Sequence, residues 1–348
     1  MNIAIYPGIW GDFERHSLTV ETLARQQPQH RFIILTDQKP TDQFSFSQNI
    51  EINFIKRPSQ NVLLKKIWWD IKLPLILKKV KADLFISFQN ACLLAAHIPQ
   101  FIMIENLEKI NKARVKIARL LIAPNNLVKK QLIKKFEIKE ERIAVIYPSA
   151  NKIYEPINEQ KKEAIKNKYT EGKEFFYFNS ILPDEKNLID LLKSFSYFKK
   201  RQQSNFKLLI NAISNSFFAK SLEGYKYRND IRIIDTKNKK EEVMITASAY
   251  AAVLPFNANE NMIAAFNAAR SGVPVVAVKN SIINEVFEDA ALYSQSEAAK
   301  DIGEKMMQVY TNEDYRTMLI ERGKQVADEY TSGKAAELLW QSIIKTLE

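Results

Sequence analysis

The first half of the chain is rich in basic side chains that could bind an anion. Residues 1–150 contain 23 lysines and arginines against 13 acids, so they carry +10 of the net charge of +11. Such an excess attracts anionic partners, for example a membrane surface, a phosphorylated lipid or a nucleic acid. Alternatively, the lysines only cover a solvated surface.

Two segments hold most of this charge. Residues 56–81 contain eight basic residues with Asp70 as the only acid, and Trp68 and Trp69 lie among them; residues 109–142 contain eleven basic residues and three acids. Basic residues interleaved with tryptophan indicate peripheral contact with an anionic membrane, or a site for a phosphate-bearing acceptor such as a polyprenyl-linked sugar. The alternative is that the tryptophans are core residues and the lysines are solvated. We find no motif that would read bases, so we expect no nucleic acid partner.

Several other kinds of chemistry are disfavoured by composition. The single cysteine, Cys92, excludes an intrachain disulfide and favours a reducing cytoplasm. With only three histidines besides it, a Cys/His zinc site is not expected, and we predict no metal. The G-x-G-x-x-G phosphate loop of dinucleotide enzymes is absent, which argues against a dehydrogenase. We therefore expect no bound cofactor.

Glycines are few, with 8 in 348 residues. Gly8 and Gly11 follow the first strand-like run, residues 2–6, in what we expect to be a loop. Glycine lets the backbone approach a ligand closely, so this loop is a candidate binding site.

Apolar strand-like runs alternate with helical patterns along the chain. The predicted strands are residues 2–6, 31–36, 52–55, 82–87, 100–104 and 143–147, then 175–178, 206–210, 231–234, 251–255 and 273–277. This alternation predicts parallel sheets with helices on both faces. Residues 115–122 are apolar but also basic, and the pattern assigns them to no element.

The pattern restarts after the polar residues 155–174, the best candidate for a linker. We therefore predict an α/β chain with two Rossmann-like domains, residues 1–150 and 151–330, and a helix over 331–348 that packs back toward the N-terminal domain. In such pairs the ligand lies in a cleft at the carboxyl ends of the strands. No apolar run reaches the roughly 18–20 residues of a membrane span, and no signal peptide is evident, so we expect a cytoplasmic protein.

Motif-like segments follow one another in a specific order. Residues 177–187 read YFNSILPDEKN, and residues 255–276 read PFNANENMIAAFNAARSGVPVV. They resemble the V-G-T-L-E-P-R-K-N and P-S-x-x-E-G-F-G-L-P-x-L-E-A-M-A-x-G-x-P-V-V segments of the GT-B glycosyltransferases of family 4 (glycosyl transferases group 1). Residues 284–286 and 289–291 match its P-E-V and D-A-A continuation. Residues 82–83 and 143–148 resemble its P-D-V-I-H-S and V-I-P-N-G elements.

This resemblance implies a nucleotide-sugar site in the C-terminal domain and an acceptor site in the N-terminal domain. Lys186 matches the phosphate-binding lysine, with Ser180 and Asn187 beside it. A lysine and helix N-termini can stabilise a leaving diphosphate without a metal. The helix N-terminus would be formed by the backbone N–H groups of Asn261, Met262 and Ile263.

Further site residues also follow from the resemblance. Thr236 and Lys237 occupy the loop that commonly contacts the nucleobase; an ordinary turn is the alternative. Glu105 and Asn106 stand where the family often has H-D, lining the cleft from the other domain. Glu105 is a candidate to act on an acceptor hydroxyl.

The active-site motif departs from the family. Its two glutamates, eight positions apart, correspond to Asn259 and Asn267. Glu260 is one residue late and could replace the first glutamate; its alternative role is to cap the following helix. Asn267 could still bond a ribose hydroxyl as a neutral amide. Glu185 replaces an arginine and would repel a diphosphate.

The expected function is transfer of a sugar from a nucleotide-diphosphate sugar, with UDP or GDP as the carrier, to a glycan or lipid-linked acceptor. Retention of configuration, independence of metal and a place in cell-envelope polysaccharide synthesis are implied by the resemblance. The main alternative is a catalytically degenerate paralogue that serves as a partner or sugar-binding subunit, and a third is a sugar-modifying isomerase. If the enzyme contacts a membrane, we expect peripheral attachment at the inner surface.

Overall fold

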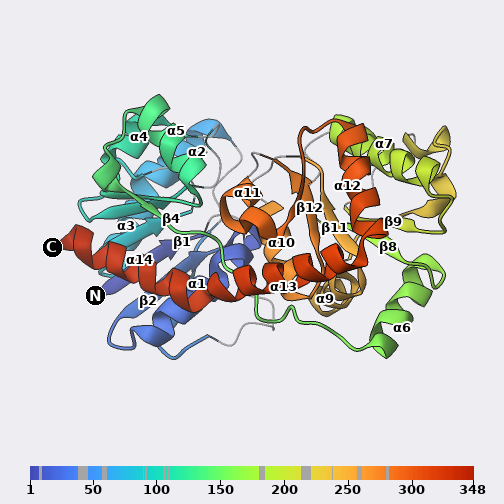
Figure 1. The fold of residues 1–348 in the computed structure, drawn as a ribbon. Coiled ribbons are helices and arrows are strands. Elements are labelled where there is room, and N and C mark those ends of the chain that lie inside the picture. The colour runs from blue at the N-terminus through green and yellow to red at the C-terminus, as the bar shows by residue number, and fades with distance from the viewer. Residues whose placement is uncertain are drawn as a thin grey trace. The chain divides into compact units, whose positions relative to one another are not determined.

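The structure is a computed structural model. It describes residues 1–7, 10–37, 46–56, 61–88, 90, 92–104, 107, 110–179, 185–212, 221–236, 238–256, 261–279 and 282–348; of residues 10–16, 62 and 65 it describes the backbone alone. The chain divides into two compact units, Met1–Pro148 with Ser332–Glu348, and Ser149–Thr331. Each unit is an α/β domain around a parallel sheet (Figure 1). The predicted fold class, two Rossmann-like domains, is confirmed.

The first unit has a seven-stranded sheet in the order β3-β2-β1-β4-β5-β6-β7. Its strands are β1 (Asn2–Tyr6), β2 (Arg31–Thr36), β3 (Ile50–Phe54), β4 (Leu84–Ser87), β5 (Gln100–Met103), β6 (Leu120–Ala123) and β7 (Ile143–Val145). Most are buried on both faces, as their continuous Ile, Leu and Phe runs predict. The unassigned residues 115–122 include the end of α4 and most of β6; their two basic residues lie in α4 and just before the strand.

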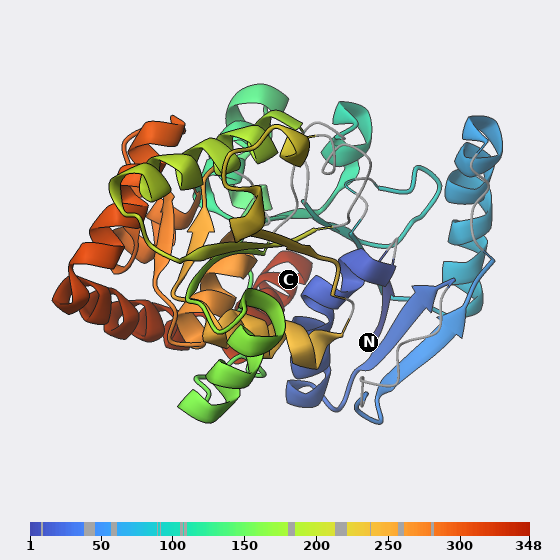
Figure 2. The same ribbon diagram turned by 90° about the vertical axis from the view of Figure 1, so that its right-hand side faces the viewer.

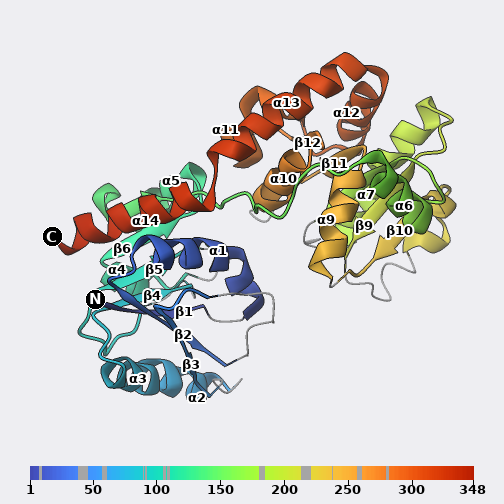
Figure 3. The same ribbon diagram turned by 90° about the horizontal axis from the view of Figure 1, so that it is seen from below.

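Helices cover both faces of this sheet. They are α1 (Trp10–Gln26), α2 (Val62–Ile67), the π-helical segment η1 (Trp68–Lys72), α3 (Leu73–Lys79), α4 (Lys112–Ile117), α5 (Asn126–Phe136), the short η3 (Glu140–Arg142) and α14 (Ser332–Leu347). In Figure 3, α1 and α14 lie on one side of the sheet and α2 and α3 on the other. Ala336, Leu339 and Ile343 of α14 share a core with Leu23 and Ala24 of α1, so the last helix belongs to the first unit.

The second unit repeats this plan with six parallel strands in the order β10-β9-β8-β11-β12-β13. The strands are β8 (Phe175–Asn179), β9 (Lys207–Asn211), β10 (Ile231–Ile234), β11 (Ala251–Leu254), β12 (Val275–Val278) and β13 (Leu292–Ser294). The helices are α6 (Glu159–Thr170), α7 (Glu185–Arg201), α9 (Lys239–Ser248), α10 (Asn261–Arg270), α11 (Ile282–Phe287), α12 (Ala299–Thr311) and α13 (Glu313–Glu329), with short 3₁₀ turns η4 (Arg228–Asp230) and η5 (Glu288–Ala290).

The segment expected to be a linker contains helix α6 instead. Asn158 caps this helix, because its side chain accepts the Lys161 N–H at 3.0 Å. The helix contributes one of the few buried lysines, Lys166, which pairs with Glu163 at 3.0 Å and Glu174 at 2.7 Å. A highly charged sequence therefore did not mean an unstructured one, because its charges pair within the helix and with the following strand.

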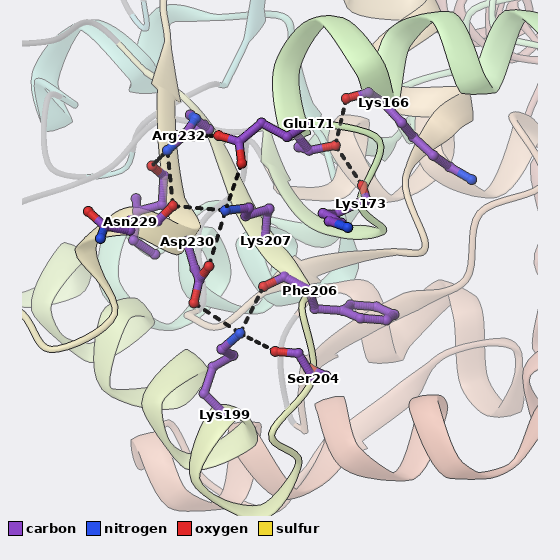
Figure 4. A network of polar contacts seen from close by, with 12 residues as sticks. Lys166, Glu171, Lys173, Lys199, Ser204, Phe206, Lys207, Asn229, Asp230 and Arg232 are labelled. Atoms are coloured by element: carbon purple, nitrogen blue, oxygen red, sulfur yellow. Dashed lines mark hydrogen bonds and ion pairs between the residues drawn. The ribbon is translucent and has the colours of Figure 1, made fainter.

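Two more buried lysines, Lys199 of α7 and Lys207 at the start of β9, reach Asp230 just before β10 (Figure 4). Lys199 reaches Asp230 at 2.9 Å, and Lys207 reaches the same carboxylate at 3.2 Å. Glu171 completes the network by pairing with Lys207 and with Arg232. Buried charges must be paired, and these pairs connect α6, α7 and two strand starts. This network is at the amino edge of the sheet, so the carboxyl edge remains available for a ligand.

Within the described residues, none of the helices combines the length and the apolar character needed to span a bilayer.

Candidate functional site

The strand order of the second sheet changes direction between β8 and β11, which are neighbours in the sheet. The chain leaves β8 toward β9 on one side and later returns to place β11 on the other. In open parallel sheets, ligands bind at such a switch point, outside the carboxyl ends of the strands. The carboxyl ends here are Asn179 of β8 and Leu254 of β11.

A cavity of about 270 Å³ lies beside these strand ends. Its described lining consists of Lys186, Asn187, Asp190, Pro255, Phe256, Glu297, Ala298 and Ala299. Two predicted residues, Lys186 and Asn187, therefore share a cavity with the segment that follows β11. Ligand pockets usually measure about 300–1,000 Å³, so this one has room for part of a nucleotide sugar.

The charges of this cavity are mixed. Lys186 is exposed and is the one basic side chain in the described lining, whereas Asp190 and Glu297 contribute carboxylates. Asp190 lies 3.9 Å from Lys193 of the same helix. A carboxylate accepts hydrogen bonds from hydroxyl groups but repels phosphate, whereas an ammonium attracts phosphate. The cavity can thus bind hydroxyls at Asp190 and Glu297 and an anion near Lys186.

The first turn of α10 is connected to the same cavity through Phe256. Asn261, the first residue of α10, is buried, and its side-chain amide donates to the Phe256 carbonyl at 2.6 Å. The Met262 side chain is buried too, and Ile263 is partly buried. Backbone N–H groups in a first turn have no partner inside the helix and lie at its positive end. These N–H groups are what this helix could offer an anion, and that role stays a prediction.

Asn267 lies in the next part of α10 and is only 5% exposed. Its side-chain oxygen, like that of Asn261, is buried without a hydrogen-bond partner among the described residues. A buried acceptor without a donor is costly, and a ribose hydroxyl would supply one. The ribose contact of Asn267 stays a prediction.

A chain of side-chain hydrogen bonds joins the strand ends next to this cavity. The backbone N–H of Thr236, just after β10, donates to the Asn211 side-chain oxygen at 3.2 Å. Asn211, at the end of β9, donates to the Asn179 side-chain oxygen at 3.0 Å. Asn179, at the end of β8, donates to Glu242 at 3.0 Å. Thr236, in the loop expected to contact the nucleobase, is therefore held by Asn211, which is held in turn by Asn179 and Glu242.

Glu242, in the first turn of α9, is the last acceptor in this series of hydrogen bonds. It also accepts the Tyr154 hydroxyl, and it pairs with Lys239 at 3.0 Å. Burial favours a higher pKa for Glu242, but Lys239 and the bonds from Tyr154 and Asn179 outweigh it and hold the pKa below its ordinary value. Burial and the Glu242 carboxylate raise the pKa of Tyr154. At neutral pH the phenol stays a donor and the carboxylate stays charged.

The remaining predicted site residues divide into two groups. Gly8, Glu105, Asn106, Ser180, Lys237, Asn259 and Glu260 lie outside the described residues. Gly11 lies in helix α1, so the expectation that it belongs to a loop was wrong. A glycine within a helix costs only about 1 kcal/mol relative to alanine, so the neighbouring residues of α1 can carry the helix through Gly11. In the part of the chain that the structure describes, no three His, Cys, Asp or Glu side chains are grouped as metal ligands would be.

Sequence reasoning missed Asn179, Asn211 and Glu242. A signal was present for the two asparagines, because each follows four buried residues and is the last residue of its strand. Nothing comparable indicated Glu242, which is 63 positions from its partner Asn179.

Comparison with known proteins agrees with this geometry. Residues 158–326, nearly all of the second unit, match the family model described as glycosyl transferases group 1. A search of curated proteins found no match.

Solved structures resemble the whole chain at low identity. A glycosyltransferase from Rickettsia africae has a TM-score of 0.78 and 16% identity, over 100% of this chain and 98% of that one. WaaG, a glycosyltransferase involved in lipopolysaccharide biosynthesis, has a TM-score of 0.73 and 14% identity, over 97% and 99%. Anabaena HepE, in complex with UDP and glucose, has a TM-score of 0.73 and 9% identity, over 99% and 100%. The chain therefore has the GT-B fold, and its second unit carries the glycosyl transferases group 1 match.

Proposed function

We propose that this protein transfers a sugar from a nucleoside-diphosphate sugar to a glycan or lipid-linked acceptor. We further propose that the reaction retains the anomeric configuration, needs no metal and serves cell-envelope polysaccharide synthesis on the cytoplasmic side. The observation that carries the proposal is the position of Lys186. This residue lines a cavity at the switch point of the unit that matches the family.

The proposed reaction breaks the bond between the anomeric carbon and the diphosphate oxygen. The bonding electrons leave with the oxygen. The acceptor hydroxyl forms the new bond and gives its proton to a base, for which Glu105 is the proposed candidate. Charge therefore develops on the diphosphate, where Lys186 and the first N–H groups of α10 would stabilise it. Asp190 and Glu297 suit the sugar hydroxyls of the donor. Glu260 or Asn259 near the sugar, and Glu105 with Asn106 near the acceptor, stay proposed site residues.

UDP is the first carrier to test, because the HepE structure contains UDP and glucose; GDP is the second. The proposed site for the base is the loop at Thr236, which is held by Asn211 at 3.2 Å. A loop held in one position would present its polar groups to the base in a defined geometry.

The second candidate function is a degenerate paralogue that binds sugars or a partner without transferring them. It is favoured by the acids near Lys186, namely Glu185, Asp190 and Glu297, which would oppose a diphosphate. It is also favoured by Asn267, which replaces an acidic ribose ligand. The fold alone does not separate these functions, because one fold can host different chemistry. An isomerase on the same fold would likewise bind a nucleotide sugar.

The first experiment is a thermal-shift series without added metal. The purified protein is melted with UDP, GDP, ADP and their common sugar conjugates. A ligand that binds the folded state raises the melting temperature. At a ligand concentration of a hundred times Kd, the free energy of unfolding rises by about 2.7 kcal/mol. Stabilisation by one nucleotide series supports the donor site and identifies its base, and hydrolysis or transfer from that conjugate is then measured.

The outcomes separate the alternatives. Stabilisation with slow hydrolysis of the conjugate supports a transferase, and conversion of the sugar while still attached to the nucleotide indicates an isomerase. Stabilisation by no member of the series at millimolar concentration favours the degenerate paralogue and contradicts the transferase.

A further inference from the structure

The α2–η1–α3 segment, residues 62–79, holds its tryptophans against the first sheet. The Trp68 indole N–H donates to the Lys56 carbonyl at 3.0 Å, and that of Trp69 donates to the Cys92 carbonyl at 3.1 Å. Both rings lie 5.5 Å from the Tyr6 ring, centroid to centroid. The tryptophans therefore belong to the core, which is one of the two alternatives that the sequence left open, and they are not the residues that a membrane would meet.

The one acid of this segment is also directed inward. Asp70 forms two hydrogen bonds with the Arg114 guanidinium, at 2.7 and 2.6 Å, and the two side chains are only 16% and 14% exposed. Arg114 donates as well to the Cys92 carbonyl at 2.9 Å. These contacts fix how the segment is rotated about its axis, and they leave its outer face without a carboxylate.

That outer face carries large apolar side chains. We call Leu63, Leu64, Ile67, Ile71 and Leu75 the aliphatic stripe; each is between 40% and 66% exposed. Four of them are spaced by four residues, a spacing that drifts around an α-helix of 3.6 residues per turn. The π-helical residues Trp68–Lys72 form a wider turn that offsets this drift. Pro74 explains the wider turn, because it has no N–H to donate to the Asp70 carbonyl.

Exposed lysines accompany this stripe. We call Lys66, Lys72, Lys78 and Lys79 the lysine rim, and all four are exposed. Figure 2 shows the segment as a helical column, in lighter blue, at the edge of the first unit beside β2 and β3. Long lysine side chains can lie along apolar surface while their ammonium groups reach a polar layer. The surface therefore presents a continuous apolar row together with positive charge.

An anionic lipid bilayer fits both features. An amphipathic helix lies in the bilayer interface with its apolar side chains at the headgroup and acyl boundary, and its lysines attract anionic headgroups. A nucleic acid would use the lysines but leave the apolar row in water. A second copy of the chain would cover the row but bring two lysine rims together, which repels. Charge complementarity thus favours the membrane.

We propose that the aliphatic stripe and the lysine rim together form a docking surface for the anionic lipid bilayer. The aliphatic stripe enters the interface, and the lysine rim contacts the headgroups. This surface lies in the unit that does not carry the family match, so the proposal holds or fails independently of the proposed sugar transfer.

The test is sedimentation of the full chain with vesicles. Vesicles of phosphatidylcholine alone are compared with vesicles of phosphatidylcholine and phosphatidylglycerol, at low and high salt. The stripe variant carries Leu63→Ser, Ile71→Ser and Leu75→Ser. The rim variant carries Lys66→Gln, Lys72→Gln, Lys78→Gln and Lys79→Gln. The parent should bind the anionic vesicles about tenfold or more tightly than either variant. High salt should weaken the binding of the parent, because the attraction between lysines and headgroups is screened.

Matched controls use exposed residues outside the docking surface. Ile153→Ser with Leu338→Ser controls for loss of apolar surface, and a Gln variant of Lys161, Lys193, Lys200 and Lys324 controls for loss of charge. Both should bind like the parent, and all variants should melt like it, since the replaced side chains are exposed. Equal binding by parent, stripe variant and rim variant would overturn the proposal, as would equal binding to neutral vesicles. A dimer that the stripe variant alone abolishes, without vesicle binding, would assign the surface to a second copy.

Discussion

The side-chain oxygen of Asn211 accepts the backbone N–H of Thr236 at 3.2 Å, so a residue at the end of β9 holds the loop that follows β10. Asn211→Ala removes this bond and the bond to Asn179. We expect the free energy of unfolding to fall by about 1–2 kcal/mol, and the Kd for the stabilising nucleotide to rise several-fold because the loop is no longer held. Calorimetric titration and a thermal melt measure the two effects.

The control is Asn229→Ala, which removes an exposed asparagine side chain just before β10. It should change neither quantity. If Asn211→Ala lowers stability but leaves nucleotide affinity unchanged, Asn211 supports the sheet and does not position the nucleotide loop.

Lys186→Ala tests the donor site directly. Its ammonium group is proposed to meet the diphosphate, and a hydrogen bond to a charged group is worth about tenfold or more in affinity. We expect donor affinity or turnover to fall by that factor, with an unchanged melting temperature because the side chain is exposed. Lys200→Ala, which removes an exposed lysine of the same helix α7, is the matched control and should behave like the parent. A Lys186→Ala protein with unchanged donor affinity and turnover would favour the paralogue.

Glu242→Gln tests the charge at the base of the hydrogen-bond chain. The folded state lowers the pKa of Glu242, because Lys239, Tyr154 and Asn179 outweigh its burial. Its contribution to stability is therefore complete above the ordinary pKa of 4.5 and is lost as the pH falls through the lowered value. The parent should be more stable than the variant by about 1–3 kcal/mol at pH 7, and the difference should shrink in acid.

Urea unfolding at a series of pH values measures this difference. Glu321→Gln, which replaces an exposed carboxylate of α13, should unfold like the parent at pH 7. A difference between parent and Glu242→Gln that stays constant down to the acid limit would show that the charge of Glu242 is not what stabilises the site.

Gly303→Ala tests the packing of α12 on α7. An added Cβ would lie 2.7 Å from the Ser194 carbonyl oxygen and 2.5 Å from the Tyr197 Cβ. Neither atom is the end of a flexible side chain, so the helices must separate, at about 1–3 kcal/mol. This exceeds the gain of about 1 kcal/mol from replacing glycine with alanine in a helix. A thermal melt should show the loss.

Gly224→Ala is the matched control, because among the described residues, its chain neighbours aside, no atom lies within 4 Å of its added Cβ. We expect a change within about 0.5 kcal/mol. Equal melting of the two variants would mean that α12 and α7 are not packed as closely as their glycine contact implies.

Much of the fold was predictable, because parallel strands buried on both faces leave continuous apolar runs. Residues 31–36 and 175–178 were predicted in this way, and both form central strands. Gly272 follows helix α10, and its φ of +74° is a conformation that favours glycine. The three-residue strand β13 was missed, because so short a run has no period. Helix α6 was taken for a linker because its apolar face is narrow.

The candidate site was predictable only where a local motif marked it. Lys186 and Asn187 follow a buried strand and begin a helix, so their motif placed them near the switch point, and the structure brings them to its cavity. Asp190 and Glu297 share that cavity but are separated by more than a hundred residues, and no local pattern connects them.

By itself, the sequence determined the parallel sheets, the family resemblance and the position of Lys186 at the start of a helix, because periodicity and motifs are local properties of the chain. The tertiary structure alone decided which face of residues 62–79 meets solvent. The bonds of Trp68, Trp69 and Asp70 to distant partners rotate those residues inward and leave the leucines and isoleucines outside. It likewise decided that Asn179, Asn211 and Glu242 form one chain of hydrogen bonds, because contacts between strand ends depend on the order of strands in the sheet.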